Sequence, residues 1–266
     1  MGFNEGLLWS IDKPDHKSSF ILGTIHMNSV FFEKHSQLFQ DLISQCDAFA
    51  AEVDLDDMLS VPMLELFQIR DGSGWSHLWR KNQFEKLSKS CQKQFGYSLS
   101  DYHSFHPILL IHLITMNMLG ESQSKSFDQS LWDLAQASGL TTFGLEEIHQ
   151  HFNVLHDYPI SEQLKLLKKL LTQSREARIK LKKMIAHYEK ENISFLYKES
   201  KRMLGKNRKS MLYERNEIML LKILKTIPHQ KCFYTCGAAH LYGAFGILRK
   251  LKNNGFHLKP ISLSFV

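Results

Sequence analysis

Four side chains of the sequence stand at the ends of short apolar runs and have the chemistry to bind a metal ion. His26 closes the segment FILGTIH and His240 closes CFYTCGAAH, so each histidine ends a Gly-x-x-His pattern that follows an apolar run. Glu52 ends the run AFAAE, and Glu146 ends TTFGLE. Imidazole together with carboxylate suits Zn²⁺, Mn²⁺, Co²⁺ or Fe²⁺ better than Ca²⁺. If these residues meet in space, they form a site for a divalent ion.

The apolar runs before these residues predict strands of one sheet. LLWSI and SSFILGTI flank the turn-rich segment DKPDHK and predict a hairpin. Further strands are predicted at residues 47–55, 140–146, 231–236 and 259–265. If the strands that carry the four residues run in one direction, their ends line one edge of the sheet, where ligands of open α/β sheets bind. The glycines are expected to let the chain turn sharply there, so that the histidines reach inward.

Helical patterns fill most of the remaining chain. The segment from about residue 56 to 140 is mostly helical in pattern, and a leucine stripe with intervening lysines follows Pro159. Strands lie near both ends of the chain, and no linker or repeat separates them. We predict a single domain over residues 1–266 of the α/β class. Its central mixed β-sheet is built from the N- and C-terminal segments, with a large helical insert at about residues 56–140.

Arg215 stands on the apolar face of a predicted helix. The residues three and four positions away are all apolar: Met211, Leu212, Ile218 and Met219. A buried guanidinium needs an anionic partner, because an unpaired buried charge is very costly. That partner is either an acidic residue of the protein itself, or a substrate carboxylate or developing oxyanion. We expect Arg215 to be mostly buried and to reach Glu52 or Glu146.

Two aspartates are further candidates for substrate binding. Asp54 lies two residues after Glu52 and shares its face of the predicted strand. Asp128 stands at the start of the predicted helix SFDQSLWDLAQASG, where helix capping or pairing with the helix dipole is the alternative. Six of the 14 histidines lie in helical or loop contexts that share no pattern and are set aside: His103, His106, His112, His149, His151 and His156.

Composition and charge exclude several classes of protein. The 266 residues are 43% hydrophobic and 23% charged, which is ordinary for a globular domain. No window approaches 18 consecutive apolar residues, so no transmembrane segment is expected. The net charge of +6 lies mostly in lysine-rich helical segments whose basic residues alternate with leucines, which favours solvated helix faces over nucleic-acid binding.

Cysteine usage and the N-terminal sequence bear on the compartment. Four cysteines are too few for a disulfide scaffold at this length, and Cys232-x₃-Cys236 without a second pair is poor evidence for zinc, so buried thiols are expected. The start, MGFNEGLLWSIDK, has no basic region and no long apolar run of a signal peptide. The protein is expected to be cytoplasmic as it stands, or exported if a leader has been trimmed.

The order of these segments resembles the TraB/GumN family, which includes the PrgY and TIKI proteins. LLWSIDK, SSFILGTIHM and DAFAAEVDL resemble the family's opening, and FDQSLWDLAQASGLTTFGLEEIHQ resembles its segment with F-D and G-L-E. ERN resembles the family's Arg-Asn helix, and CGAAHLYGAFGILRKLKNNGFHL its closing Gly-x-x-His-Leu-x-Gly segment. The resemblance spans nearly the whole chain and implies an α/β fold. Carried over by motif, it singles out these residues: His26, Glu52, Glu146, Arg215 and His240.

The resemblance also implies a function. TIKI members are metal-dependent peptidases that cleave a secreted signalling protein, and PrgY-like members reduce peptide pheromone activity. We expect a metal-dependent, peptidase-like hydrolase that acts on a peptide or protein signal. Its Mn²⁺, Co²⁺ or Zn²⁺ ion would be held by His26, His240, Glu52 and Glu146. Glu52, Glu146 and Arg215 would act in catalysis, and Asn216 would join Asp54 and Asp128 in substrate binding.

Two alternatives and two departures from the family pattern stand beside this expectation. The protein could bind and sequester a peptide without cleaving it, or hydrolyse another ester or amide with the same metal, because a fold does not fix a substrate. His151 stands five residues after the G-L-E glutamate, where the family often has glutamine. Tyr242 replaces the usual proline of the closing segment. The departures bear on substrate choice more than on the metal site.

Overall fold

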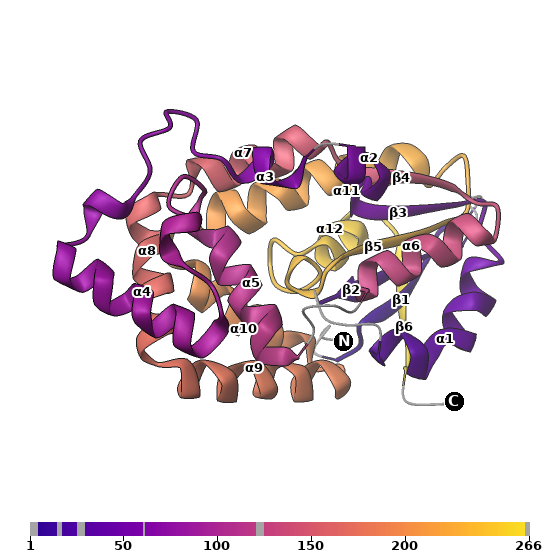
Figure 1. Cartoon of the computed structure of the whole chain (residues 1–266). Helices are drawn as coiled ribbons and strands as arrows, with labels where there is room; N and C mark the ends of the chain where they lie inside the picture. The colour runs from indigo at the N-terminus through magenta and orange to yellow at the C-terminus, as the bar shows by residue number, and fades with distance from the viewer. Residues whose placement is uncertain (1–4, 15–17, 26–29, 61, 121–124, 264–266) are drawn as a thin grey trace. The chain divides into compact units, whose positions relative to one another are not determined.

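Within the residues that the structure describes, a six-stranded mixed sheet forms the centre of the larger of two compact units (Figure 1). The computed structural model describes residues 5–14, 18–25, 30–60, 62–120 and 125–263. In sheet order, the strands are β4 (Thr141–Glu146), β3 (Ala48–Val53), β5 (Cys232–Gly237), β2 (Ser19–Thr24), β1 (Leu8–Asp12) and β6 (His257–Ile261). β4, β3, β5 and β2 are parallel, whereas β1 pairs antiparallel with β2 and β6. The carboxyl ends of four strands thus lie at one edge of the sheet.

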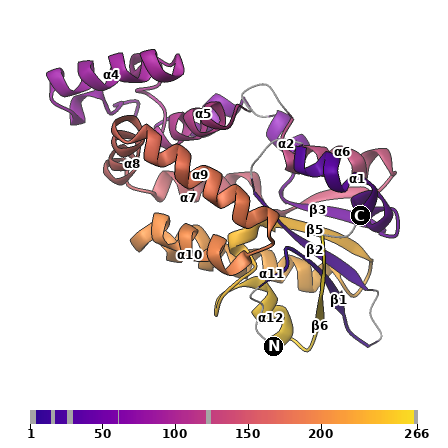
Figure 2. The same ribbon diagram turned by 90° about the horizontal axis from the view of Figure 1, so that it is seen from below.

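Apolar side chains on both faces of the sheet pack against helices. α1 (Val30–Ile43) and α6 (Phe127–Ala137) cover the face that carries Phe49 and Phe233. α11 (Arg215–Thr226) and α12 (Ile247–Asn253) cover the opposite face, which carries Ala50 and Tyr234. Figure 2 shows these two helix layers on either side of the sheet. The result is the predicted α/β fold, in which five strands of the sheet come from segments near the two ends of the chain and β4 comes from its middle.

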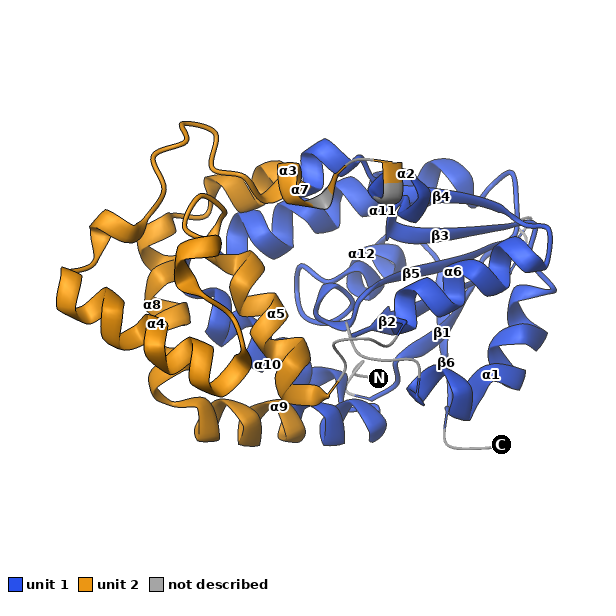
Figure 3. Cartoon of the chain, viewed as in Figure 1, with its two compact units in different colours: residues 1–58, 124–151, 184–266 blue, residues 59–123, 152–183 orange. Residues whose placement is uncertain are grey.

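The chain forms two compact units (Figure 3), which comprise residues 1–58, 124–151 and 184–266, and residues 59–123 and 152–183. The second unit is helical, and its core is built by α4 (Lys81–Phe95), α5 (Pro107–Leu119) and α8 (Ile160–Thr172). The remaining α-helices are α2 (Leu55–Ser60), α3 (Met63–Phe67), α7 (Ile148–Asp157), α9 (Ser174–Glu189) and α10 (Ile193–Leu204). The helical insert expected at about 56–140 is divided between the units, because α6 packs on the sheet.

Three further expectations can be compared with the fold. The hairpin is confirmed, with Leu8 opposite Leu22 in the β1–β2 pair, and all four cysteines are free and buried. The closing α-helix, α12, begins at Ile247, after Gly243, whose φ of +97° interrupts helical geometry. In the described part of the chain, no helix combines the length and the apolar composition needed to cross a bilayer.

Neither glycine of the two Gly-x-x-His patterns has the positive φ that a sharp turn would require, and only the first serves close packing. Gly23 lies inside β2, and a β-carbon added there would lie only 2.9 Å from the Cα of Ala238. Gly237 ends β5 with an ordinary φ of −53°. A β-carbon at Gly237 would meet its nearest neighbours, in His240 and Glu52, at 3.4 and 3.5 Å. Close packing of β2 against the turn that follows β5 therefore requires the first glycine much more than the second.

Gly23→Ala should destabilise the protein more than Gly237→Ala. The added methyl of Gly23→Ala meets backbone and a buried leucine, so we expect a loss of about 1–3 kcal/mol in the free energy of unfolding. Gly237→Ala adds the same methyl where only ordinary contacts result, and should cost less than about 1 kcal/mol. Urea unfolding followed by circular dichroism measures both. Equal losses would contradict this account of the first glycine.

Candidate functional site

The candidate site lies at the carboxyl ends of the parallel strands. Glu52 is the penultimate residue of β3, Glu146 is the last residue of β4, and His240 ends a short 3₁₀ turn, Ala238–His240, directly after β5. The strand register places Val53 opposite Glu146, and the backbone N–H of Gly237 donates to Glu52 Oε2 at 2.9 Å. The structure therefore brings three of the four expected metal ligands to one edge. The fourth, His26, lies outside the described residues.

Arg215, the first residue of α11, joins the two carboxylates. Its Nε donates to both oxygens of Glu146 at 3.1 and 3.0 Å, and its Nη2 donates to Glu146 Oε2 at 2.7 Å. The same Nη2 also forms an ion pair with Glu52 Oε1. The residue is 8% exposed. Its burial and its pairing with the carboxylates of Glu52 and Glu146 agree with what its place among apolar residues predicts.

The apolar face around Arg215 is not the uninterrupted one that the sequence suggested. Leu212 and Met219 are buried, but Ile218 is 36% exposed. A π-helical turn, Lys209–Glu214, directly precedes α11. A π-turn inserts an extra residue into the helical repeat and shifts the register of the faces on either side of it. Because of this register change, Arg215 faces the ends of the strands, whereas part of the apolar face that we expected around it is exposed to solvent.

His151 is a member of the site that the sequence analysis set aside. Its Nδ1 lies 2.9 Å from Arg215 Nη2, 3.3 Å from Glu146 Oε2 and 3.8 Å from Glu52 Oε1. Because a guanidinium N–H can only donate, Nδ1 accepts from Arg215 and the ring proton of the neutral imidazole sits on Nε2. α7 begins two residues after β4 ends, and its first turn returns His151 to the strand end. The spacing of five residues from Glu146 was the available signal.

His240 is held in one tautomer by Asn216. The amide nitrogen of Asn216 donates to the carbonyl of Phe245 at 2.7 Å, so its Oδ1 faces His240 Nδ1, 2.6 Å away. Nδ1 must therefore carry the proton, and Nε2 keeps its lone pair. Asn216 is 1% exposed and uses both polar atoms within the protein. This corrects its assignment to substrate binding, because its amide positions the imidazole instead.

The charges of the site are strongly coupled. Burial raises the pKa of Glu146, but the hydrogen bonds that Arg215 donates to it, together with the charge of that guanidinium, outweigh burial and hold the pKa below its usual value. Burial lowers the pKa of Arg215, yet the carboxylates of Glu52 and Glu146 raise it overall. Burial lowers the pKa of His240 to about 4, although the charge of Glu52 opposes the shift. Glu146 and Arg215 are therefore ionised, and His240 is neutral, at physiological pH.

The two candidate aspartates lie at the starts of helices. Asp54 follows β3 and accepts hydrogen bonds from the backbone N–H groups of Asp56 and Asp57, at 3.0 and 3.2 Å, in the first turn of α2. This corrects its placement on the strand face beside Glu52. Asp128 lies in the first turn of α6, whose N-cap is Ser126. That position fits the helix-dipole alternative.

The donor atoms suit a divalent ion, but a nitrogen of the protein stands among them. Glu52, Glu146 and His151 each offer one ligand atom, and these three atoms lie within 4.8 Å of one another. Carboxylate and imidazole ligands are typical of Mn²⁺, Co²⁺ and Zn²⁺ sites. All three residues also contact Arg215 Nη2. A metal ion fits the chemistry of these ligands once the guanidinium has moved from its position between them.

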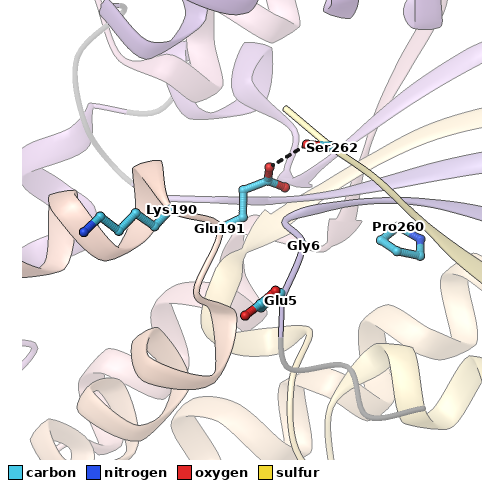
Figure 4. A pocket seen from close by; sticks show the side chains of 6 residues that line it. All are labelled: Glu5, Gly6, Lys190, Glu191, Pro260 and Ser262. Atoms are coloured by element: carbon cyan, nitrogen blue, oxygen red, sulfur yellow. Dashed lines mark hydrogen bonds between the residues drawn. The ribbon is translucent and has the colours of Figure 1, made fainter. Parts of the chain in front are cut away.

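At two hollows elsewhere, carboxylates and an imidazole do not come together around one point as they do at the candidate site. One, of about 320 Å³, is lined by Glu5, Gly6, Lys190, Glu191, Pro260 and Ser262. Figure 4 shows the Glu191 carboxylate bonded to Ser262 while Lys190 points away. The Glu191 carboxylate also accepts from the backbone N–H groups of Leu7 and Leu263. The other hollow, in the helical unit, is lined in part by Arg70 and His156. We interpret the first as a structural clamp that ties the α9–α10 turn to residues beside β1 and β6.

Arg215→Met should destabilise the protein by about 3–5 kcal/mol, because it leaves two carboxylates of the site without their shared cation. Arg202→Met is the matched control, since Arg202 pairs with Glu199 on the surface, with 65% of its side chain exposed. That change should cost less than about 1 kcal/mol. Chemical unfolding at neutral pH measures both. Similar losses in the two variants would show that the Arg215 network contributes little to stability.

The free energy of unfolding should fall as the pH is lowered from 6.5 toward 4. The unfolded chain binds a proton on His240 with the ordinary pKa of 6.5, whereas burial lowers the folded pKa to about 4. This contribution is present above pH 6.5 and is lost as the pH falls through 4, an effect on the order of 3 kcal/mol. His106, whose pKa burial also lowers to about 4, adds to the same window.

Two variants isolate the share of His240 in this pH dependence. His240→Gln should reduce the slope of unfolding free energy against pH between 6.5 and 4, because no imidazole remains there to titrate. His257→Gln changes an exposed histidine of β6 and should leave the slope as it is. An unaltered slope in His240→Gln would contradict a buried, neutral His240.

Comparison with known proteins supports the resemblance seen in the sequence. The model of the TraB/PrgY/gumN family matches residues 7–260. The matched span contains all the residues of the site described above. A comparison with curated proteins gave no match. Because the family match covers nearly the whole chain, the protein belongs to the TraB/PrgY/gumN family.

Proposed function

We propose that the protein is a metal-dependent hydrolase that cleaves an amide bond of a peptide or protein signal. The observation that carries the proposal is the meeting of Glu52, Glu146 and His151 around one point at the carboxyl ends of parallel strands. Ligands of open α/β sheets bind at such an edge. The family includes members with this function, and the chemistry of the site in this chain supports the same function here.

The residues of the site divide into roles for such a reaction. A divalent ion held by Glu52, Glu146 and His151 would polarise a carbonyl and lower the pKa of a water molecule. Glu52 is the better general base, because its side chain is 14% exposed whereas that of Glu146 is 1% exposed. His240 presents an unprotonated Nε2 and can accept a proton. Arg215 supplies the positive charge that a substrate carboxylate or a developing oxyanion requires.

A second candidate function is peptide binding without cleavage. It is favoured by one observation, namely that Arg215 pairs with both carboxylates of the site and offsets one of their two negative charges. A site whose charged side chains already pair with one another could bind the charged end of a peptide and release the peptide unchanged. Turnover separates this candidate from the hydrolase.

Metal-free protein should not cleave a panel of fluorogenic peptides, and addition of Mn²⁺, Co²⁺ or Zn²⁺ should start turnover. Glu52→Gln should then lower kcat by about 10²–10⁴-fold, the usual contribution of a general base. Glu199→Gln, which changes a partly exposed carboxylate of α10 that pairs with Arg202, is the control and should keep full activity. Peptide binding without product at any metal concentration would contradict the hydrolase and favour the sequestering protein.

A further inference from the structure

Arg215 Nη2 takes the position that a metal ion would need. It has three acceptors at contact distance: Glu52 Oε1, Glu146 Oε2 at 2.7 Å and His151 Nδ1 at 2.9 Å. An Nη2 group carries only two hydrogens, so the acceptors around it outnumber the protons that it can share. At least one of the three acceptor atoms therefore cannot receive a hydrogen of its own from Nη2. Such an arrangement is typical of ligands that converge on a cation.

A metal ion and the guanidinium exclude one another from this position. Ligand atoms of this kind contact Zn²⁺ at about 2.0–2.2 Å. An ion bound to all three ligand atoms would lie almost on top of Nη2, which is itself in contact with each of them. Charge adds to the steric conflict, because two cations would face each other in a site that is mostly removed from water. Only one of them can contact the three ligands at a time.

We propose that the guanidinium of Arg215 and a divalent cation are alternative occupants of the position enclosed by Glu52, Glu146 and His151. In the metal-free protein, Arg215 serves as the internal counter-cation that keeps the two carboxylates ionised and buried. Metal entry replaces Nη2 and frees the guanidinium from the carboxylates. The inference rests on the proposed metal-dependent function and adds a regulatory step to it, since the freed arginine becomes available to an anionic group of the substrate.

If Arg215 competes with the metal ion, removing it should change metal affinity in the opposite direction from removing a residue that helps to hold the ion. A residue that helps to hold a metal weakens binding when it is removed, whereas a competitor strengthens binding when it is removed. Calorimetric titration of the metal-free chain with Zn²⁺ should therefore give a lower Kd for Arg215→Met than for the natural protein. We expect the gain to be about 10- to 100-fold, the range over which neighbours of ligand atoms change metal affinity.

Two further variants define the source of the gain. Arg202→Met, which removes a surface arginine paired with Glu199, should bind Zn²⁺ like the natural protein. His151→Gln introduced together with Arg215→Met should abolish most of the gain, because it removes one of the three ligands. Zn²⁺ binding by Arg215→Met that equals or is weaker than that of the natural protein would overturn the exchange and leave the metal site standing. Absence of Zn²⁺ binding in both proteins would overturn the metal-dependent function as well.

A measurement on the natural protein covers the case in which Arg215→Met does not fold. In protein labelled with ¹⁵N-arginine, the Nε–H of Arg215 should give a protected signal, because it is buried and donates to Glu146. The signal is assigned by its loss in Arg215→Lys. Saturating Zn²⁺ should shift the signal or expose it to solvent exchange. An unchanged signal while calorimetry shows Zn²⁺ bound would overturn the proposal.

Discussion

The ion pairs of Arg215 with Glu52 and Glu146 are the interaction on which the site depends. Two carboxylates on adjacent strands, β3 and β4, would repel each other at this depth without a cation between them. The guanidinium that joins them enters from α11, directly after a π-helical turn. The charged cluster of Arg215, Glu52 and Glu146 therefore depends on the pairing of β3 with β4, on the packing of α11 and on the register of that helix. A change in any of these elements would alter the electrostatics of the cluster.

The neighbouring histidines extend this arrangement in different ways. His151 Nδ1 accepts from Arg215, so its lone pair points into the cluster. His240 is fixed in the other tautomer by Asn216, whose amide is itself held by the carbonyl of Phe245. Both imidazoles thereby present a defined nitrogen without a proton. The cluster therefore combines a buried permanent charge with two imidazole nitrogens that carry lone pairs.

The sequence predicts the parts of the site that depend on local pattern and misses those that depend on side-chain contacts across the fold. Apolar runs ending in Glu52 and Glu146 predict strands, and the apolar surroundings of Arg215 predict its burial. His151 was set aside with other histidines, because its role follows from the turn between β4 and α7 and only its spacing of five residues from Glu146 pointed to it. Likewise, Asp54 has the spacing of a site residue, but β3 ends before it and its carboxylate binds the first turn of α2.

The most direct test of the account is a crystal structure of the protein soaked with Zn²⁺, with anomalous diffraction measured at the zinc edge. The account predicts an anomalous peak between Glu52, Glu146 and His151, with the Arg215 guanidinium turned away from both carboxylates. A zinc ion bound elsewhere, with Arg215 still between Glu52 and Glu146, would contradict it.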